Sequence, residues 1–525
     1  MISVLPQDPI LSFAEAKQFE EAYFSGDEEK EWVVMSRAGE AVGDSALRDM
    51  RELRTIPHRP RILILVGKGH NGADALLACK RFLRTIPTSK AVVWPWSNKE
   101  SCRPMTQRAF EELIDFAAKR IEILSPSEEM NMEVIRGTFD QVTEDRGFDL
   151  VVDGLLGMQS RPGLQPLMKE WIHLLNQSEK IAVRISVDLP SGVTEEPSQE
   201  PEAFQADFTY CTGIVKKAVT LDFNQGFTGR LRYLDLGFFK GMDGNQPSHA
   251  QRVLRSSALP FLRKLRPVNS DKRDFGHLLV LAGSKELGGA AMMTVQGALR
   301  AGVGLVTCCV PESLHGSMVA SCPEAMWIPI PETPTGGLAL EGLGKIRLCL
   351  DRVNSLVAGP GLGSDPESHS LIREVCRIFD GPILLDADAL RPEVIESLPA
   401  KEKTVLTPHQ GELNRISENK PDEFLHSYPG VILLKGPHSR VCYDHSILNL
   451  FCGSSLLARG GSGDILSGII GALLARQDYS LPDCVALGAM WHGRAAEALA
   501  RQHGQEAVTT TQVLDYLSFA LRNDF

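Results

Sequence analysis

Short apolar runs separated by amphipathic stretches organise the first half of the chain. Each run has the length and continuous hydrophobicity of a strand that is buried on both faces of a parallel sheet. We expect such strands at residues 61–66, 91–94, 149–153 and 181–188. Before them, residues 10–53 carry apolar side chains at helical spacing, which predicts two helices. The alternation of strands and helices predicts a doubly wound α/β domain.

The second half shows the same alternation and predicts a second doubly wound α/β domain. A helix of small residues is expected from Gly288 to about Arg300. Between the halves, residues 240–254 are polar and rich in residues that break helices and strands. We therefore place a linker at 240–254, between domains at 1–239 and 255–525. Strands of the second domain are expected within residues 274–284, 305–307, 355–363, 382–390, 404–412 and 431–436.

One glycine-rich loop, Gly460-Gly461-Ser462-Gly463-Asp464, leads directly into an apolar run at 465–475. Its glycines let backbone N–H groups converge on a small anion at the positive end of the helix that follows. The Asp464 carboxylate would repel a phosphate, but it is well placed to take a proton from a hydroxyl that attacks one. A glycine-rich turn with Asp464 as a helix cap is the alternative interpretation.

Residues 67–74 satisfy the G-x-G-x-x-G spacing between a strand and a helix, so a dinucleotide site has to be considered. The next expected strand ends without the acidic residue that would hold a ribose. Instead, Asn71 and Asp74 lie in the loop, and Asp153 and Asp188 end later strands. Because the carboxyl ends of parallel strands meet at one edge of a sheet, these four side chains are expected to gather there. For any one of them, capping of the following helix is the alternative.

Composition narrows the class of protein. A formal charge of −11 over 525 residues argues against non-specific binding to nucleic acid or to an anionic membrane, but not against small anionic ligands. No apolar run approaches the roughly 18 residues of a membrane span, and the first residues lack the basic region of a signal peptide. The eleven scattered cysteines lack zinc-ligand spacing and suit reduced thiols, so we expect a cytoplasmic protein.

Four motifs of the first half together resemble the NAD(P)H-hydrate epimerase (YjeF N-terminal) family, over roughly residues 10–236. They are Gly-Lys-Gly-His-Asn-Gly-Ala-Asp at 67–74, Val-Val-Asp-Gly-Leu-Leu-Gly at 151–157, Val-Asp-Leu-Pro-Ser-Gly at 187–192, and Ala-Asp-Phe-Thr at 206–209 with Lys216. The resemblance implies a Rossmann-like domain in which Asn71, Asp153 and Ser191 bind K⁺ and Asp188 contacts the substrate in a catalytic role. It implies further substrate contacts from His70, Asn71, Gly72, Ala73, Asp74 and Gly157. His70 and Ala73 stand where the family has Asn and Gly.

The second half contains no P-loop motif, so any nucleotide is held in another way. Its Gly-Ser-Gly-Asp loop resembles the ribokinase-like NAD(P)H-hydrate dehydratase family, together with four strand-end motifs. These are Gly-Pro-Gly-Leu-Gly at 359–363, Leu-Asp-Ala-Asp-Ala-Leu at 385–390, Leu-Thr-Pro-His at 406–409 and Leu-Leu-Lys-Gly at 433–436. The resemblance covers about residues 255–520. It assigns Gly361, His409 and the catalytic Asp464 to the hydrated nicotinamide nucleotide. It assigns to the adenine nucleotide Lys435, Gly436, Pro437, His438, Ser439 and Gly463.

Together the two resemblances imply an enzyme that repairs hydrated NADH and NADPH, in which water added to the dihydronicotinamide ring gives a 6-hydroxy compound. The second domain would dehydrate the S form with ADP or ATP, and the first would interconvert the R and S forms. The implied metal ion is K⁺, with Mg²⁺ as a further candidate. The expected partners are the hydrated dinucleotide and the adenine nucleotide, in a homo-oligomer without nucleic acid or membrane. Two alternatives stay open: a hydroxyl kinase in the second half and a non-catalytic binding or dimerisation module in the first.

Overall fold

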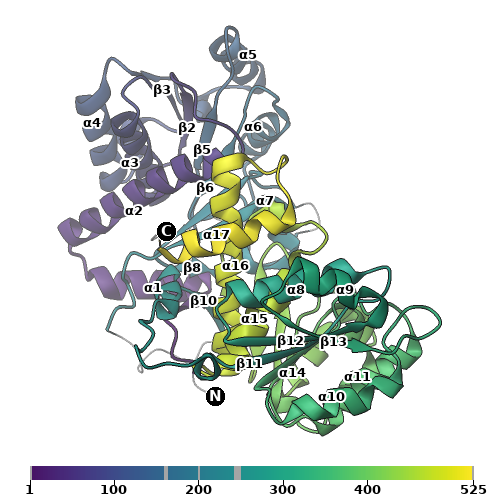
Figure 1. The fold of residues 1–525 in the computed structure, drawn as a ribbon. Helices are drawn as coiled ribbons and strands as arrows, with labels where there is room; N and C mark the ends of the chain where they lie inside the picture. Colours follow the sequence, from purple (N-terminus) through teal and green to yellow (C-terminus); the bar gives the residue numbers. More distant parts are fainter. Residues whose placement is uncertain (1–2, 159–162, 199–200, 242–249, 523–525) are drawn as a thin grey trace. The chain divides into compact units, whose positions relative to one another are not determined.

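The computed structural model describes residues 3–158, 163–198, 201–241 and 250–522. The chain divides into two compact units, whose elements are labelled in Figure 1. The N-terminal unit comprises residues 8–249, and the C-terminal unit comprises residues 250–525 together with residues 1–7. Of the expected linker, residues 242–249 lie outside the described residues, and β10 (Gln251–Leu254) forms its last part.

A parallel sheet with the strand order β4-β3-β2-β5-β6-β7-β9 forms the centre of the N-terminal unit. Two further strands, β1 and β8, pair with each other in parallel. The strands are β1 (Gln7–Leu11), β2 (Arg61–Val66), β3 (Lys90–Pro95), β4 (Ile121–Ile123), β5 (Leu150–Gly154), β6 (Arg184–Val187), β7 (Phe208–Thr212), β8 (Val215–Lys216) and β9 (Arg230–Leu234). The helices are α1 (Phe13–Phe24), α2 (Glu28–Asp49), α3 (His70–Thr85), α4 (Pro104–Ala117), α5 (Met132–Thr143), α6 (Pro166–Gln177) and α7 (Gln225–Thr228).

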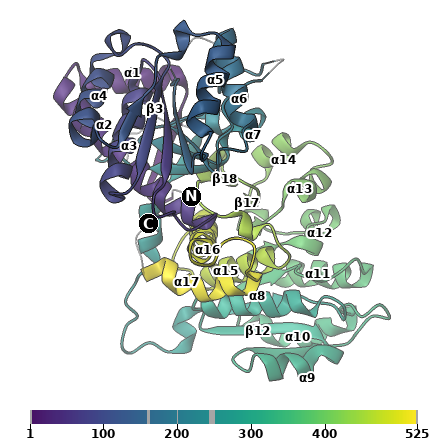
Figure 2. The same cartoon turned by 90° about the horizontal axis from the view of Figure 1, so that it is seen from above.

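Successive residues of β2 point to opposite faces of this sheet, so its continuous apolar run serves two cores. Ile62 and Ile64 pack with residues of α2, α3 and α4, whereas Leu63 and Leu65 pack with residues of α5 and α6. Figure 2 shows these two groups of helices on either side of the sheet. The helices therefore cover both faces, and the carboxyl edge of the sheet is left for the loops.

The C-terminal unit has a sheet with the order β13-β12-β11-β14-β15-β16-β17-β18-β19-β10. Pairing is parallel from β13 to β17, and antiparallel between β17, β18 and β19. Besides β10, the strands are β11 (His277–Leu281), β12 (Leu305–Pro311), β13 (Met326–Ile330), β14 (Ser355–Ala358), β15 (Ile383–Leu385), β16 (Thr404–Leu406), β17 (Val431–Leu434), β18 (Ser439–Tyr443) and β19 (Ser446–Leu450). The helices are α8 (Gly288–Arg300), α9 (Glu312–Ser321), α10 (Leu343–Leu350), α11 (Pro366–Ile378), α12 (Pro392–Glu396), α13 (Gln410–Ile416), α14 (Pro421–Ser427), α15 (Ser462–Arg476), α16 (Leu481–His503) and α17 (Val513–Arg522).

The helix α15, which follows the Gly-Ser-Gly-Asp loop, is buried against the sheet and against α8. Two of its glycines permit this close approach. A Cβ at Gly468 would lie 2.0 Å from the carbonyl oxygen of Thr294 in α8, and one at Gly471 would lie 2.4 Å from Val357 in β14. In Figure 2, α8, α15 and α16 lie together in the C-terminal unit. This packing fixes the direction of α15 and therefore the place where its N-terminus points.

The α/β fold class with two doubly wound halves is confirmed. The expected strand at 61–66 matches β2, whereas the expected strand at 181–188 is shorter and spans Arg184–Val187. The two helices expected in 10–53 are α1 and α2, and the short strand β1 precedes them. Within the ranges described, none of the helices combines the length and the apolar character that a membrane crossing needs.

Two candidate active sites

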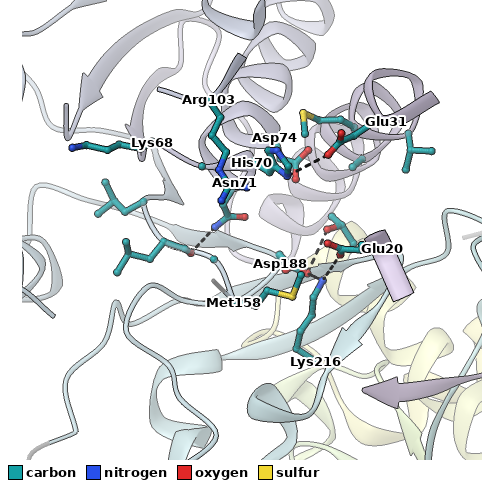
Figure 3. Close-up of a pocket in the computed structure, with 18 of the residues that line it drawn as sticks. Glu20, Glu31, Lys68, His70, Asn71, Asp74, Arg103, Met158, Asp188 and Lys216 are labelled. Carbon is teal, nitrogen blue, oxygen red and sulfur yellow. Dashed lines mark hydrogen bonds and ion pairs between the residues drawn. The ribbon is translucent and has the colours of Figure 1, made fainter. Parts of the chain in front are cut away.

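A cavity of about 690 Å³ lies at the carboxyl edge of the sheet in the N-terminal unit (Figure 3). The segments after β2, β5 and β6 form part of its wall together with the ends of β7 and β8, and residues of α1 and α2 form much of the rest. Asn71, Asp74 and Asp188, which were expected to gather at one sheet edge, share this cavity. The ionisable side chains of its wall are Glu20, Glu31, Lys68, His70, Asp74, Arg103, Asp188 and Lys216.

A buried ion pair joins Lys216 to Asp188. The Lys216 Nζ donates to Asp188 Oδ1 at 2.8 Å and lies 3.9 Å from Glu20 Oε1. Burial alone would lower the pKa of Lys216, but the negative charges of Asp188 and Glu20 raise it by more than burial lowers it. The amine therefore keeps its positive charge. Asp188 adopts a φ of +65°, a left-handed conformation that costs a non-glycine residue of order 1–3 kcal/mol. Strain of this kind concentrates at functional sites.

The pKa values of two carboxyl groups in the cavity are raised, chiefly by burial. The pKa of Glu20 is raised to about 7, chiefly by burial. The charge of Lys216 lowers this pKa, and the charges of Asp188 and Glu31 contribute to raising it. Burial also raises the pKa of Asp74 well above its ordinary value, and Asp188 adds to this effect. Within the described residues, the buried Oδ1 of Asp74 has no hydrogen-bond partner. The cavity therefore places carboxyl groups of raised pKa beside the positive charge of Lys216.

His70 contributes a neutral ring to the wall of the cavity. Its Nδ1 lies 3.4 Å from Glu31 Oε1. Burial lowers the pKa of His70 to about 4, and the charge of Arg103 lowers it further. At pH 7 the contact with Glu31 is therefore not an ion pair. A neutral imidazole can still donate or accept a hydrogen bond.

The three expected K⁺ ligands surround the segment Leu155–Leu156. Asn71 Nδ2 donates to the Leu156 carbonyl at 2.8 Å, and Ser191 Oγ accepts from Leu156 N at 2.9 Å. Ser191 Oγ in turn donates to Asp153 Oδ1 at 2.6 Å. Asp153 is completely buried and also accepts from Ser186 Oγ and from the backbone of Leu155 and Ser191. Asp153 thus lies behind the loop, whereas Asn71 also lines the cavity.

Residues 70–74, in which Asn71 and Asp74 were expected to lie in a loop, instead form the first turn of α3. A Cβ at Gly72 would lie 2.3 Å from the carbonyl oxygen of Gly67, so only glycine fits there. Ala73 is buried in the hydrophobic core beneath α3, and neither Ala73 nor Gly72 is among the described residues that line the cavity. Gly157 lines the cavity, and a Cβ added there would lie 3.7 Å from the Cβ of Asn71.

In the C-terminal unit, the N-terminus of α15 forms the second candidate site. Gly461 caps this helix with a φ of +86°, and a Cβ there would collide with the Met293 side chain at 2.4 Å. Asp464 lies in the first turn, where backbone N–H groups have no partner within the helix. A Cβ at Gly463 would lie 3.4 Å from Lys435 Nζ, so the loop closes over that side chain.

Asp386 holds Lys435 beneath this loop. Lys435 Nζ donates to Asp386 Oδ1 at 2.7 Å, and Ser467 Oγ donates to Asp386 Oδ2 at 2.7 Å. Burial alone would lower the pKa of Lys435, but Asp386 and Glu412 raise it, so Lys435 is charged. The pKa of Asp464 is raised to about 6, chiefly by burial. The charges of Asp386 and Asp388 contribute to raising this pKa, and the charge of Lys435 lowers it. At neutral pH Asp464 is therefore ionised but more basic than an exposed aspartate.

Neighbouring strand ends bring the other expected residues to the same edge of this sheet. His409 forms a β-bridge with Lys435, and its Nδ1 accepts from Gly411 N at 3.0 Å at the start of α13. Its side chain is 61% exposed, so it can meet a ligand. Gly361 follows β14 with a φ of +64°. Gly436, Pro437, His438 and Ser439 continue from Lys435 into the turn before β18 and its first residue.

Several polar residues of the two sites received no role from the sequence. Ser467 follows Asp464 by three residues and therefore lies on the same helix face, a signal that could have identified it. Asp386 directly follows β15, and its place at the carboxyl end of a strand could have identified it in the same way as Asp153. Lys216 was part of the resemblance without a role. Glu20 carried no local signal, because only the packing of α1 over the strand ends brings it to the cavity.

Comparisons with known proteins identify the family of each half of the chain. The family described as NAD(P)H-hydrate dehydratase matches residues 278–518, and the family described as YjeF-related protein N-terminus matches residues 31–218. A crystal structure of ADP/ATP-dependent NAD(P)H-hydrate dehydratase from Bacillus subtilis, co-crystallized with ATP/Mg²⁺, is 24% identical, with a TM-score of 0.43, and the match covers 51% of this chain and 96% of that one. The bifunctional NAD(P)H-hydrate repair enzyme of Gloeobacter violaceus is 32% identical over 94% of each chain. That of Moorella thermoacetica is 30% identical over 94% of this chain and 92% of its own. At this identity and coverage, the chain belongs to the family of bifunctional NAD(P)H-hydrate repair enzymes.

Proposed function

We propose that this chain repairs hydrated NADH and NADPH. The C-terminal unit would dehydrate the S form with ADP or ATP, and the N-terminal unit would interconvert the R and S forms. The observation that carries the proposal is the Asp464 carboxylate in the first turn of α15, beside the Lys435–Asp386 pair. The two family matches fall on separate units, which supports one activity for each.

Asp464 has the properties of a base that activates a hydroxyl. Its pKa of about 6 leaves it ionised at pH 7 and still basic enough to accept a proton efficiently. It would take the proton of the 6-hydroxyl as that oxygen attacks the terminal phosphate of the nucleotide. The first-turn N–H groups of α15 would stabilise the charge on the transferred phosphate. Departure of this phosphate from C6, with loss of a proton from C5, restores the double bond of the ring.

The adenine nucleotide would lie along the turn that follows β17. Lys435 supplies a positive charge there, and a Cβ at Gly436 would meet no atom within 4 Å, so a ligand can approach the backbone. Both oxygens of the Asp386 carboxylate accept hydrogen bonds, from Lys435 and from Ser467, so this carboxylate does not offer an open position to Mg²⁺. Mg²⁺ would instead be bound through the phosphates of the nucleotide. Within the described residues, no group of three or more His, Cys, Asp or Glu side chains could hold a metal ion.

The hydrated nicotinamide half would enter the cavity of the N-terminal unit. Its volume of about 690 Å³ falls within the roughly 300–1,000 Å³ of ligand sites. His70, Asn71 and Asp188 would provide its polar contacts from the wall. Asp74 and Gly157 would complete the contact from the wall, and Gly72 and Ala73 would support the first turn of α3 behind Asn71.

Asn71, Asp153 and Ser191 fit a bound K⁺ by the chemistry of their oxygen atoms, which are the donors that this ion prefers. Asp153 is fully buried, and burial raises its pKa although four hydrogen bonds lower it. Within the described part of the chain, no lysine or arginine compensates its charge. A cation held here would supply that compensation and fix the loop that carries Leu156 and Gly157 against the substrate.

The experiment that tests the proposal is dehydration of the purified S hydrate by the full chain, with ADP or ATP in separate reactions. We expect the absorbance of the reduced nicotinamide to return at a rate that depends on the nucleotide, and one phosphate to be released for each hydrate consumed. A stable phosphorylated product without that absorbance would show a hydroxyl kinase instead, and the proposal would be wrong.

A further inference from the structure

Glu20 is a polar group of the N-terminal cavity to which the family resemblance gives no role. It lies on α1, an element outside the strand-end loops, and its side chain is about one quarter exposed. Figure 3 shows its carboxyl group beside Lys216 and Asp188, facing the cavity. The Lys216 Nζ lies 3.9 Å from Glu20 Oε1 but only 2.8 Å from Asp188 Oδ1. The single ammonium is thus shared unequally, and Asp188 has the stronger contact.

The charges around Glu20 favour its protonated form. Lys216 of β8 is the positive neighbour, whereas Asp188 after β6, Glu31 of α2 and Asp74 of α3 are carboxyl groups that face the same space. Burial is the largest effect and raises the pKa of Glu20 to about 7. A carboxylic acid with a pKa near the working pH can both give and take a proton readily.

Asp74 provides an independent sign that a ligand meets this group of residues. Its Oδ1 is buried and, within the described residues, has no hydrogen-bond partner, although the side chain lines the cavity. A buried polar atom without a partner costs about 1–3 kcal/mol. Such an atom in a cavity wall marks a position that a bound molecule can satisfy.

We propose that Glu20 is the general acid of the epimerisation, and this inference rests on the function proposed above for the cavity. Glu20 gives its proton to the C6 hydroxyl as the C6–O bond breaks with its electron pair on oxygen, so that water leaves. The lone pair of N1 forms the N1=C6 double bond at the same time. Water then adds to the opposite face, the π electrons return to N1, and the proton released by this water returns to the Glu20 carboxylate through solvent in the cavity. No other reactant is consumed.

Lys216 and Asp188 take different parts in this step. Asp188 forms an ion pair with Lys216 in the cavity wall, and its carboxylate offsets the positive charge that develops on the ring. Lys216 is a positioning residue, because it holds Asp188 and tunes Glu20 by its charge. Removal of this charge favours the neutral form of Glu20, so the pH at which activity falls should move upward.

The test uses the full chain and the isolated S hydrate without nucleotide, and measures formation of the R form by chromatography. For Glu20→Gln we expect kcat to fall by at least about 100-fold with KM unchanged. A misfolded cavity would change KM as well, so this result would distinguish a lost proton donor from a distorted site. Glu21→Gln is the matched control, because Glu21 is the exposed next residue of α1 and pairs with Lys17. We expect it to keep the rate of the unaltered chain.

The pH profile separates a proton donor from a structural residue. In the unaltered chain the rate should fall as pH rises through about 7, because the acid form of Glu20 is lost. Lys216→Met should move this decrease in rate to higher pH. If Glu20→Gln does not fold, Glu20→Asp replaces it, and its rate should still decrease with rising pH, but over a shifted pH range. The proposal is overturned if Glu20→Gln keeps more than about a third of the rate or retains the same fall. If the unaltered chain does not exceed the spontaneous rate, the epimerase function itself is wrong, which is a different result.

Discussion

Substitution of Asp464 by Asn removes the proposed base without changing its shape. The carboxylate lies in the first turn of α15, where burial and the charges of Asp386 and Asp388 raise its pKa to about 6. The amide cannot accept the hydroxyl proton, but it leaves the N–H groups of the helix terminus in place. Dehydration and nucleotide binding should therefore respond in different ways to this one change.

A positioned base contributes about 10²–10⁴ in rate. Its loss corresponds to about 3–5 kcal/mol of activation free energy, at 1.36 kcal/mol for each factor of ten. The helix terminus itself contributes at most about 2 kcal/mol to binding of a negative charge, and the substitution leaves that contribution intact. Because Asp464→Asn also removes a negative charge near the phosphates, the Kd for ADP or ATP should stay the same or decrease.

The same substitution should stabilise the folded protein at pH 7. The pKa of Asp464 is about 6 in the folded protein against an ordinary 3.8, so the ionised form is disfavoured by folding. This difference corresponds to at most about 3 kcal/mol, and solvent at the partly exposed side chain reduces it. The native state binds the proton more tightly, so the stability of the unaltered chain falls as pH rises from 3.8 to about 6. The gain in the variant should be complete above that range and absent below it.

The assay is dehydration of the S hydrate at saturating nucleotide, with Kd measured by calorimetry and Tm measured at pH 5 and pH 7. Asp444→Asn is the matched control, because Asp444 is exposed in the β18–β19 turn at a φ of +45° that Asn tolerates. In the unaltered chain, kcat/KM should fall as pH drops below about 6, since the base becomes protonated. Turnover of Asp464→Asn within tenfold of the control would refute the assignment of Asp464 as the base.

Three further changes test other parts of the two sites. Lys435→Met leaves the Asp386 carboxylate buried without its cationic partner. The free energy of unfolding measured in urea should therefore fall by about 3 kcal/mol, and the Kd for nucleotide should rise. An unchanged unfolding midpoint would contradict the role of this pair. Replacement of K⁺ by choline at constant ionic strength should slow epimerisation by the unaltered chain several-fold. In Asp153→Asn the rate should no longer depend on K⁺. If the rates of both proteins depend equally on K⁺, Asp153 is not a ligand. Gly461→Ala requires a left-handed alanine that collides with Met293, so Tm should fall and nucleotide binding should weaken, and a wild-type Tm would show that the loop adapts freely.

Much of the candidate site in the N-terminal unit follows from one physical rule. The carboxyl ends of parallel strands meet at one sheet edge, so Asn71, Asp74 and Asp188 could be expected together from their places after apolar runs. The rule does not say which side chain faces the cavity. Asp153 also ends a strand, yet it points behind the loop and bonds to Ser191. That choice depends on how Leu155 and Leu156 pack, which no local pattern records.

Contacts between distant segments account for what the sequence left out. Glu20 reaches the cavity because α1 packs over the strand ends, and its spacing within α1 resembles that of any exposed glutamate. Asp386 meets Ser467 across 81 residues of sequence, and only the close packing of α15 brings them together. The backbone bond from Arg255 N to the Pro6 carbonyl likewise ties the first residues to the C-terminal unit.

Repair of the pure R hydrate by the full chain with nucleotide requires both proposed activities in one protein. We expect complete return of the reduced nicotinamide absorbance, much faster than spontaneous epimerisation allows. We expect Asp464→Asn to give no such return while it still converts R into a mixture of R and S. Recovery from R at only the spontaneous rate, with fast recovery from S, would contradict the proposed role of the N-terminal cavity, and no recovery from either form would contradict the whole account.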